Sequence, residues 1–400
     1  MNTQEIVKNI FYVGVNDRTT HIFESLWSLP YGVSYNSYLI RDGKNVLIDT
    51  VESGQTYDFM DKLSSILESE PIHYLVINHM EPDHSGSIPA IVAKYPDIKI
   101  IGNKQTIGMI KGFYHINDDK LFYEVKDGDV LELGTRHLSF HLTPMVHWPE
   151  TMMCYIPEDK LLFSGDAFGT FGALNGTAID TYTDTELYIR EMYRYYACIV
   201  GKYGRFVQKA LSALSDFPLE YICPTHGPVW NNEIEKVVDI VDTLSKGEGE
   251  DGVTIVYGSM YGNTQVLAEA IASELANLGI RKIRVHNAAK DDMSEIISDA
   301  FRYKGLIVGS PTYSMNLFPP VESLMQAMLT RDVKNKTFAA FGSYTWASAA
   351  LKKLHEYADR LGWEVVSSIE MKQAPNEDHL FAAKELARKF KETLYDQTGI

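Results

Sequence analysis

Apolar and polar positions follow two different patterns on either side of a charged, glycine-rich segment. Before it, apolar runs are short and bounded by turn residues, as in strands and hairpins. After it, apolar runs of strand length alternate regularly with stretches of helical period. The segment itself, residues 246–252, reads KGEGEDG and has no apolar side chain. We therefore predict two domains, residues 1–246 and 252–400, joined by a linker.

The first half is predicted to combine short strands with flanking helices. The strands are expected at residues 37–40, 45–50, 74–78, 98–101, 137–143, 152–156 and 161–164. Helices are expected at residues 87–94, 185–203 and 205–214. Mixed strands with helices outside them indicate an α/β fold of the αββα sandwich type.

The second half alternates strands and helices more strictly. The strands are expected at residues 253–257, 282–286, 305–309, 337–342 and 364–370. Between the first two, residues 266–278 have a helical pattern that Gly279 is expected to end. Five strands that alternate with helices over this length predict a doubly wound parallel sheet.

Composition narrows the functional classes. The 400 residues carry a formal charge of -16, which argues against a general nucleic-acid binder. The first nine residues lack the basic-then-apolar order of a signal peptide. No run approaches the roughly 18 apolar residues of a membrane span. We therefore expect a cytoplasmic protein with neither nucleic acid nor membrane among its partners.

Three widely spaced cysteines, Cys154, Cys198 and Cys223, indicate a reduced, intracellular chain without a disulfide framework. None of them forms a C-x-x-C pair. The sequence therefore encodes no rubredoxin-like or iron–sulfur module of its own.

Polar loops that follow predicted strands carry histidine and acidic residues at several places. Residues 78–86 read NHMEPDHSG, and three further residues of these types follow later strands. The candidates are His79, Glu81, Asp83, His84, His147, Asp166 and His226. Side chains at strand ends converge, and so many charged groups need compensation. The pattern therefore predicts a metal site.

This arrangement resembles the metallo-β-lactamase family over roughly residues 1–245. The family signature is His-x-His-x-Asp-His followed by a distant His, Asp and His, and Glu81 stands where the hydrolases carry histidine. Residues 145–150 and 165–169 are similar to one branch, the flavodiiron proteins (A-type flavoproteins). The extra carboxylate adds negative charge and a hard oxygen donor, which suits iron better than zinc.

The resemblance implies two non-haem irons. It implies His79, Glu81 and His147 on one iron, Asp83 and His226 on the other, and Asp166 as the bridge. For His84, beside the second iron, the spacing leaves open whether the imidazole ligates or turns away.

Two residues lie in segments similar to family regions near the diiron pocket. His21 and Tyr196 are each interpreted as donors of a hydrogen bond or proton. The alternatives are a surface histidine and an ordinary packing tyrosine.

The strand at residues 253–258 runs into hydroxyl-bearing residues and then a helix, which together form an anion cradle. The loop matches neither G-x-x-x-x-G-K-[ST] nor G-x-G-x-x-G, so ATP and NAD are poorly supported. It resembles the FMN-phosphate loop of flavodoxins, with similarity over roughly residues 252–400. The predicted FMN contacts are Ser259, Met260, Tyr261, Gly262, Asn263, Thr264, Pro311, Thr312, Tyr313, Asn316, Ser343, Tyr344, Thr345 and Trp346.

Together the two halves predict an oxidoreductase that reduces dioxygen to water, nitric oxide to nitrous oxide, or both. The resemblance implies a rubredoxin-like carrier or a reduced flavin or deazaflavin as electron donor. It also implies a head-to-tail homodimer or a dimer of dimers. Two alternatives remain at this point: a zinc-dependent hydrolase with an accessory flavodoxin-like domain, and an electron carrier with a structural metal site.

Overall fold

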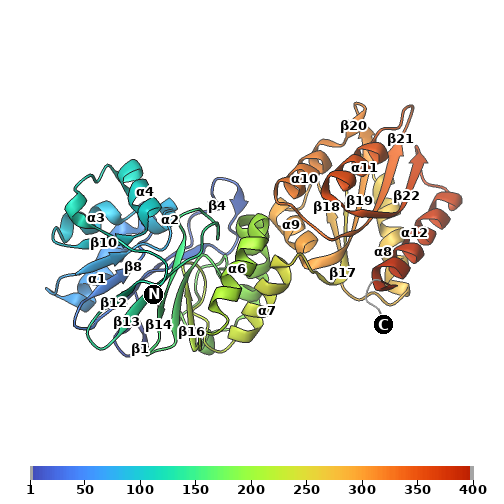
Figure 1. The fold of residues 1–400 in the computed structure, drawn as a ribbon. Helices are drawn as coiled ribbons and strands as arrows, with labels where there is room; N and C mark the ends of the chain where they lie inside the picture. The colour runs from blue at the N-terminus through green and yellow to red at the C-terminus, as the bar shows by residue number, and fades with distance from the viewer. Residues whose placement is uncertain (1–2, 397–400) are drawn as a thin grey trace. The chain divides into compact units, whose positions relative to one another are not determined.

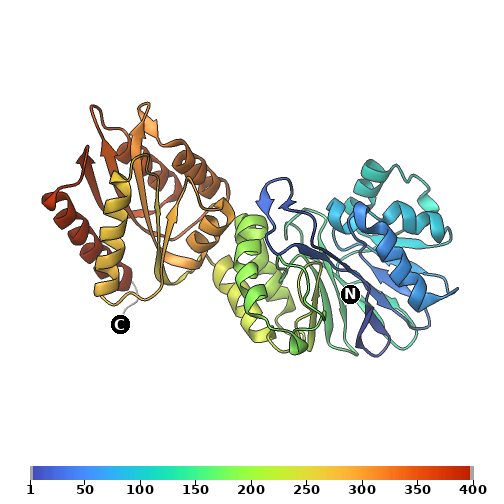
Figure 2. The ribbon, with the colours of Figure 1, turned by 180° about the vertical axis from the view of Figure 1, so that it is seen from behind.

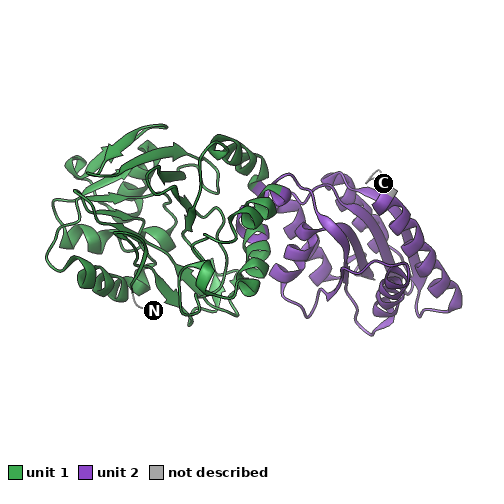
Figure 3. Ribbon diagram, turned by 90° about the horizontal axis from the view of Figure 1, so that it is seen from below, with its two compact units in different colours: residues 1–196, 203–242 green, residues 197–202, 243–400 purple. Residues whose placement is uncertain are grey.

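The computed structural model describes residues 3–396, which form two compact units (Figure 3). The first unit comprises the residues up to 196 together with residues 203–242. The second comprises residues 197–202 and those from 243 onward.

Two sheets form the centre of the first unit. The larger sheet, in spatial order, is β1 (Gln4–Val7), β2 (Ile10–Tyr12), β7 (Tyr38–Ile40), β8 (Val46–Ile48), β9 (Tyr74–Val76), β10 (Lys99–Gly102) and β11 (Phe122–Glu124). The other is β12 (Val130–Glu132), β13 (His137–Leu142), β14 (Met152–Ile156), β15 (Leu161–Gly165) and β16 (Tyr221–Pro224). Small two-stranded sheets pair β3 (Val15–Asp17) with β6 (Val33–Tyr35) and β4 (Ile22–Phe23) with β5 (Trp27–Ser28).

Helices cover the outer sides of the two sheets (Figure 1). On one side lie α1 (Thr56–Leu67), α3 (Ile88–Lys94) and α4 (Lys104–Tyr114), and on the other α6 (Gly204–Leu214) and α7 (Ile234–Ser245). The short α2 (Pro82–Ser85) and α5 (Glu186–Tyr195) complete the helices of this unit. The predicted αββα sandwich is confirmed.

One predicted helix and the predicted linker differ from the structure. The helical stretch expected over residues 185–203 is present, but it is α-helical only to Tyr195 and continues as a π-helix (Tyr196–Val200) and a 3-10 helix (Gly201–Tyr203). All residues from 191 to 200 are buried, so this stretch offers no polar face that would reveal its period. The linker is shorter than predicted, because β17 (Glu250–Tyr257) already begins inside it.

A single parallel sheet forms the second unit. Its strand order is β18 (Ile283–Asn287), β17, β19 (Tyr303–Tyr313), β21 (Thr337–Tyr344) and β22 (Glu364–Lys372), with the short β20 (Asn316–Leu317) paired to β19. Counted along the chain, this is the order 2-1-3-4-5 of flavodoxin-like folds. The five predicted strands are confirmed, most of them longer than expected.

Helices cover both faces of this sheet, as Figures 1 and 2 show. One face packs against α8 (Asn263–Asn277) and α12 (Glu377–Asp396), whose apolar residues share a core with β17, β19 and β21. The other face is covered by α9 (Met293–Arg302), α10 (Pro319–Thr330) and α11 (Ala350–Leu361). Gly279 ends the α8 segment with a φ of +95°, a conformation that favours glycine.

Within residues 3–396, no helix combines the length and the apolar character needed to cross a membrane.

Candidate metal centre and flavin cavity

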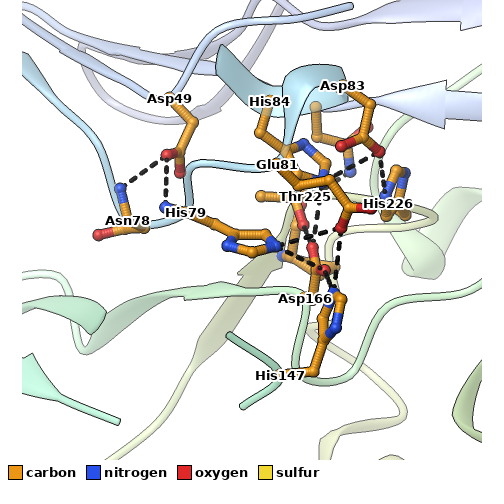
Figure 4. Close-up of polar contacts among 12 residues, drawn as sticks. Asp49, Asn78, His79, Glu81, Asp83, His84, His147, Asp166, Thr225 and His226 are labelled. Atoms are coloured by element: carbon orange, nitrogen blue, oxygen red, sulfur yellow. Dashed lines mark hydrogen bonds and ion pairs between the residues drawn. The ribbon is translucent and has the colours of Figure 1, made fainter. Parts of the chain in front are cut away.

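The predicted ligands come from four strand ends of the first unit and meet in one place (Figure 4). β9 leads into the loop with His79 and Glu81, and α2 carries Asp83 and His84. The loops after β13, β15 and β16 supply the other three, His147, Asp166 and His226. All seven side chains are buried, with 0–9 % of their surface exposed.

The side chains divide into two clusters of ligand atoms. In the first, His147 Nε2 lies 3.1 Å from Glu81 Oε2 and 3.0 Å from Asp166 Oδ2. His79 Nε2 completes it, 3.3 Å from the same Glu81 oxygen and 3.5 Å from the same Asp166 oxygen. Four residues thus aim one ligand atom each at a common point.

The second cluster consists of Asp83, His84 and His226. Asp83 Oδ2 lies 3.2 Å from His226 Nε2 and 3.3 Å from His84 Nε2. The other oxygen of Asp166, Oδ1, lies 3.1 Å from His84 Nε2. Asp166 therefore faces both clusters, one oxygen to each.

These separations fit metal ions. Bonds of about 2.0–2.2 Å in tetrahedral or octahedral geometry hold ligand atoms about 3.0–3.5 Å apart. Several of the close pairs do not have hydrogen-bond geometry. Among the described residues, both oxygens of Asp83, both ring nitrogens of His84, Nε2 of His226 and Oδ2 of Asp166 are buried without a hydrogen bond. A cation in each cluster would compensate these atoms, whereas an apolar or empty site would not.

The electrostatics of the metal-free cluster lead to the same conclusion. Burial lowers the pKa of His147, but the carboxylates of Asp166 and Glu81, 3.0 and 3.1 Å from its Nε2, outweigh burial and raise it to about 9. Burial would raise the pKa of Glu81, yet hydrogen bonds from His147 and His79 bring it below its ordinary value. The carboxylates therefore hold protons on the imidazoles, and those protons are what a metal ion displaces.

Buried groups around the clusters fix the ligand loops. Asp49 Oδ1 accepts hydrogen bonds from the backbone N–H groups of Asn78 (2.7 Å) and His79 (3.3 Å) (Figure 4). Thr225 Oγ1 donates to Asp166 Oδ1 at 2.5 Å. His226 Nδ1 donates to the backbone oxygen of Ser34 at 2.7 Å, which leaves Nε2 for the cluster.

A cavity of about 690 Å³ lies at the carboxyl ends of the strands in the second unit. It is lined by Ser259, Met260, Tyr261, Asn263, Thr264, Pro311, Thr312, Tyr313, Ser314, Met315, Ser343, Tyr344, Thr345, Trp346, Ala347, Gln373 and Ala374. Twelve of the predicted FMN contacts are among these residues, and Gly262 and Asn316 are not. Asn316 instead pairs with Tyr313 in the β19–β20 hairpin.

The start of α8 in this cavity fits a phosphate group. The helix has 15 residues, and its N-cap is Gly262 at φ +89°, so no side chain caps the first N–H groups. A buried hydroxyl pair, Thr264 Oγ1 and Ser343 Oγ at 2.9 Å, lies beside this helix end. Free N–H groups at a helix N-terminus together with hydroxyls bind anions.

Large apolar side chains on the cavity rim fit a flat ring. Tyr261 and Trp346 are each 90 % exposed, and Tyr313 and Met315 are about half exposed. Exposed apolar groups gathered around a pocket mark a binding site. A bound isoalloxazine would cover part of this surface.

Both units match known protein families. A family model described as ODP family beta lactamase matches residues 33–227, and the flavodoxin model matches residues 255–386. The anaerobic nitric oxide reductase flavorubredoxin of Escherichia coli O1:K1 is 35 % identical over 389 residues, which cover 96 % of this chain and 81 % of the relative. This chain is a flavodiiron protein.

Solved structures of flavodiiron proteins agree over the full length. Rubredoxin oxygen:oxidoreductase from Desulfovibrio gigas matches all of both chains with a TM-score of 0.95 and 27 % identity. The flavodiiron protein from Giardia intestinalis has a TM-score of 0.93 and 26 % identity, covering 99 % of this chain and 98 % of its own. The predicted family and both domain folds are confirmed, and the protein is an oxidoreductase with a flavin domain and a metal-binding cluster.

Three further candidates of this flavodiiron protein, His84, His21 and Tyr196, lie in different surroundings. His84 is fully buried, and its Nε2 faces the second cluster. His21 is exposed and belongs to neither cluster. Tyr196 is buried at the start of the π-helix.

A tyrosine that sequence analysis missed, Tyr195, lies beside the predicted metal ligands. Tyr195 is buried, and its ring centroid is 5.5 Å from that of His226. Burial, and then the negative charges of Asp166 and Asp83, raise the pKa of its hydroxyl well above its ordinary value. A Cβ at position 169 would come within 3.2 Å of the Tyr195 ring, so Gly169, in the loop after Asp166, leaves room for this tyrosine.

A second missed residue is Glu24, at the turn between β4 and β5. Trp27 Nε1 donates a hydrogen bond to Glu24 Oε2 at 3.2 Å. The residue is exposed as a whole, but desolvation of its carboxyl, and then the charge of Glu81, raise its pKa to about 7. A single acid in a polar turn gives no sequence signal, and only the fold brings it beside Glu81.

Proposed function

We propose that this flavodiiron protein uses two non-haem irons and one FMN to reduce dioxygen to water, nitric oxide to nitrous oxide, or both. The observation that carries the proposal is the pair of adjoining clusters joined by Asp166. We propose His79, Glu81 and His147 as ligands of one iron and Asp83, His84 and His226 as ligands of the other, with Asp166 bridging them. Three carboxylates in one buried site favour a metal that takes up higher charge.

The electron count agrees with this pair of cofactors. Reduction of dioxygen to two waters takes four electrons and four protons, and two ferrous ions with one reduced flavin supply four electrons. Reduction of two nitric oxide molecules to nitrous oxide and water takes two electrons and two protons. The chain's own contribution is to hold the metals side by side, to bury the reaction from bulk water and to place the Tyr195 hydroxyl next to the clusters.

The FMN is proposed to bind in the cavity of the second unit. The start of α8 would hold its phosphate, with Ser259 and Thr264 beside it, and the rim aromatics would contact the ring. Gly262 is proposed as the position that lets the phosphate approach the backbone closely. Asn316 would act from the hairpin next to the cavity rather than from its wall.

Electrons are proposed to enter at the flavin from a small carrier such as rubredoxin, or from a reduced flavin or deazaflavin. Two relatives support the first donor through their names, flavorubredoxin and rubredoxin oxygen:oxidoreductase. We also propose a head-to-tail homodimer, or a dimer of such dimers, in the cytoplasm. An acidic carrier would need a local basic or apolar docking patch, because this chain itself carries a formal charge of -16.

The deciding experiment is to quantify metal and flavin on the purified protein, reduce it without oxygen, and add oxygen or nitric oxide. We expect two irons and one FMN per chain and rapid reoxidation by at least one of the gases. The ratio of the two reoxidation rates then identifies the preferred substrate. Zinc without reoxidation would overturn the proposal in favour of a hydrolase, and flavin without gas consumption would favour a simple carrier.

A further inference from the structure

A buried glutamate behind the first cluster touches a ligand without facing the metal position. Glu150 follows His147 in the loop that leads to β14 and is completely buried. Its Oε1 accepts hydrogen bonds from His79 Nδ1 and from the backbone N–H of Met80, both at 2.9 Å. Among the described residues its Oε2 has no hydrogen bond. The carboxylate is therefore directed at His79 and is compensated by little else.

The histidines of the second cluster have no such partner. His226 Nδ1 donates to a neutral backbone oxygen, that of Ser34, and His84 Nδ1 is buried without a hydrogen bond within residues 3–396. A hydrogen bond to a carboxylate makes an imidazole a stronger metal ligand and fixes its ring. Of these three histidines, only His79 receives that effect.

Charge differs between the clusters in the same direction. Asp166 offers one oxygen to each, so its charge is shared. Among the ligand carboxylates, the first cluster adds Glu81, with Glu150 acting through His79, whereas the second cluster adds Asp83. More negative charge and more basic ligands favour the more highly charged state of a metal ion.

We propose that Glu150 is a positioning residue that makes the two metal positions unequal. Through His79 it makes the first cluster the tighter position, and the one whose iron is harder to reduce. The iron held by Asp83, His84 and His226 would then become ferrous first. The redox part of this inference rests on the proposed function, and the affinity part requires only that the clusters bind a divalent cation.

The substitution Glu150→Gln tests the charge without removing the side chain. A glutamine keeps an oxygen that can accept from Met80 and His79, and the backbone oxygen of residue 150 keeps its 2.6 Å hydrogen bond from Asn103 Nδ2. The matched control is Glu274→Gln in the second unit, where a buried carboxylate bonds Arg388 Nε at 3.0 Å. Titration of the metal-free proteins with cobalt(II), followed by visible absorbance, reports both binding steps.

We expect two unequal binding steps in the wild-type protein. Glu150→Gln should weaken the tighter step by about 10- to 100-fold and leave the weaker step unchanged, while Glu274→Gln changes neither. Equal weakening of both steps, or no weakening, would overturn the proposal. His79→Ala and His226→Ala give a second test if Glu150→Gln does not fold, since the proposal requires His79→Ala to remove the tighter step.

With iron bound, a redox titration followed by electron paramagnetic resonance tests the second half. The wild-type protein should pass through a mixed-valence state over a range of potentials, and Glu150→Gln should narrow that range. An unchanged range would refute the redox role. The cobalt titration needs neither iron, flavin nor turnover, so a failure of the proposed gas-reducing function remains distinguishable from a failure of this inference.

Discussion

The two candidate sites of this protein differ in burial and in how their polar groups are compensated. The metal centre is made of buried titratable groups, several without hydrogen bonds, that compensate one another only if cations lie between them. The flavin cavity is open, and its hydroxyls, backbone groups and aromatic rims bond one another or face solvent. We therefore expect the metal centre to be sensitive to charge and proton concentration, and the flavin cavity to respond mainly to the loss of individual contacts.

The largest expected effect comes from the carboxylate that faces both clusters. Asp166→Asn should remove both metal ions and slow reoxidation by the gas substrate more than 100-fold, beyond the roughly 10- to 100-fold typical of outer-shell changes. FMN should stay bound, because the flavin cavity is a separate site. Metal analysis and flavin absorbance on the same sample test this.

The control is Asp180→Asn. The buried carboxylate of Asp180 accepts hydrogen bonds from the backbone N–H groups of residues 231–233 and belongs to neither cluster. If Asp166→Asn kept two metal ions per chain, the role of Asp166 as a shared ligand would be wrong.

The second largest effect is expected from a fall in pH, which should weaken metal binding but not FMN binding. Because the pKa of His147 in the metal-free protein is raised to about 9, metal binding below pH 9 must displace a proton. Affinity should therefore fall as pH falls, by about tenfold per unit for each displaced proton. Glu81, whose pKa is lowered, stays ionised and adds nothing to this slope. Metal titrations from pH 6 to 10 measure it.

FMN affinity should be flat between pH 7 and 9, because the second phosphate pKa is about 6. A metal affinity that stays constant below pH 9 would contradict the conclusion that the imidazoles of the cluster carry protons before a metal binds.

Loss of one hydroxyl in the flavin cavity should have a smaller effect. Thr264→Val removes a polar contact at the start of α8, and a hydrogen bond to a charged group is worth about 1.5–3 kcal/mol. FMN should bind about 10- to 100-fold more weakly, with metal content unchanged. Fluorescence titration of the flavin-free protein measures the change. Thr254→Val, which removes a hydroxyl bonded to the backbone of Asp299 instead, should leave FMN affinity as it is.

The smallest effect is expected from Tyr195→Phe. A single neutral hydrogen bond contributes about 0.5–1.5 kcal/mol, so reoxidation should slow by about 2- to 10-fold while both metals and FMN remain. Stopped-flow absorbance of the flavin follows the rate. Tyr196→Phe is the matched neighbour, and a larger effect there than at Tyr195 would favour Tyr196 as the donor of a hydrogen bond or proton.

Sequence analysis could predict the elements and site residues that leave a local pattern along the chain. The three central strands of the second unit, β17, β19 and β21, are largely buried and rich in apolar residues, whereas the edge strands β18 and β22 are partly exposed and mix apolar with polar residues. All five were predicted because they alternate with stretches of helical period. Strands such as β4 and β5 have two residues each, too few to show a period. The seven metal-binding candidates were found because each follows a recognisable strand in a polar loop.

Residues that act from behind the ligands were harder to find. Asp49 was included in a predicted strand, and its contacts to the backbone of residues 78 and 79 depend on the pairing of β8 with β9. Glu24 and Tyr195 come from a turn and from a helix end, neither of which has a local signal of function. Their placement depends on tertiary contacts that no spacing along the chain encodes.

The short helix α2 has a consequence for the proposed pair of metals. Glu81 precedes Pro82, the first residue of this helix, while Asp83 and His84 lie within its single turn. One stretch of six residues, from 79 to 84, thus contributes side chains to both clusters and would supply ligands to both proposed ions. The spacing of the two clusters is then set largely by local backbone geometry, and motion of one sheet against the other should change it little. Warming the protein should loosen the two ligand candidates outside this stretch that follow β13 and β16, His147 and His226, before it alters the spacing of the two clusters.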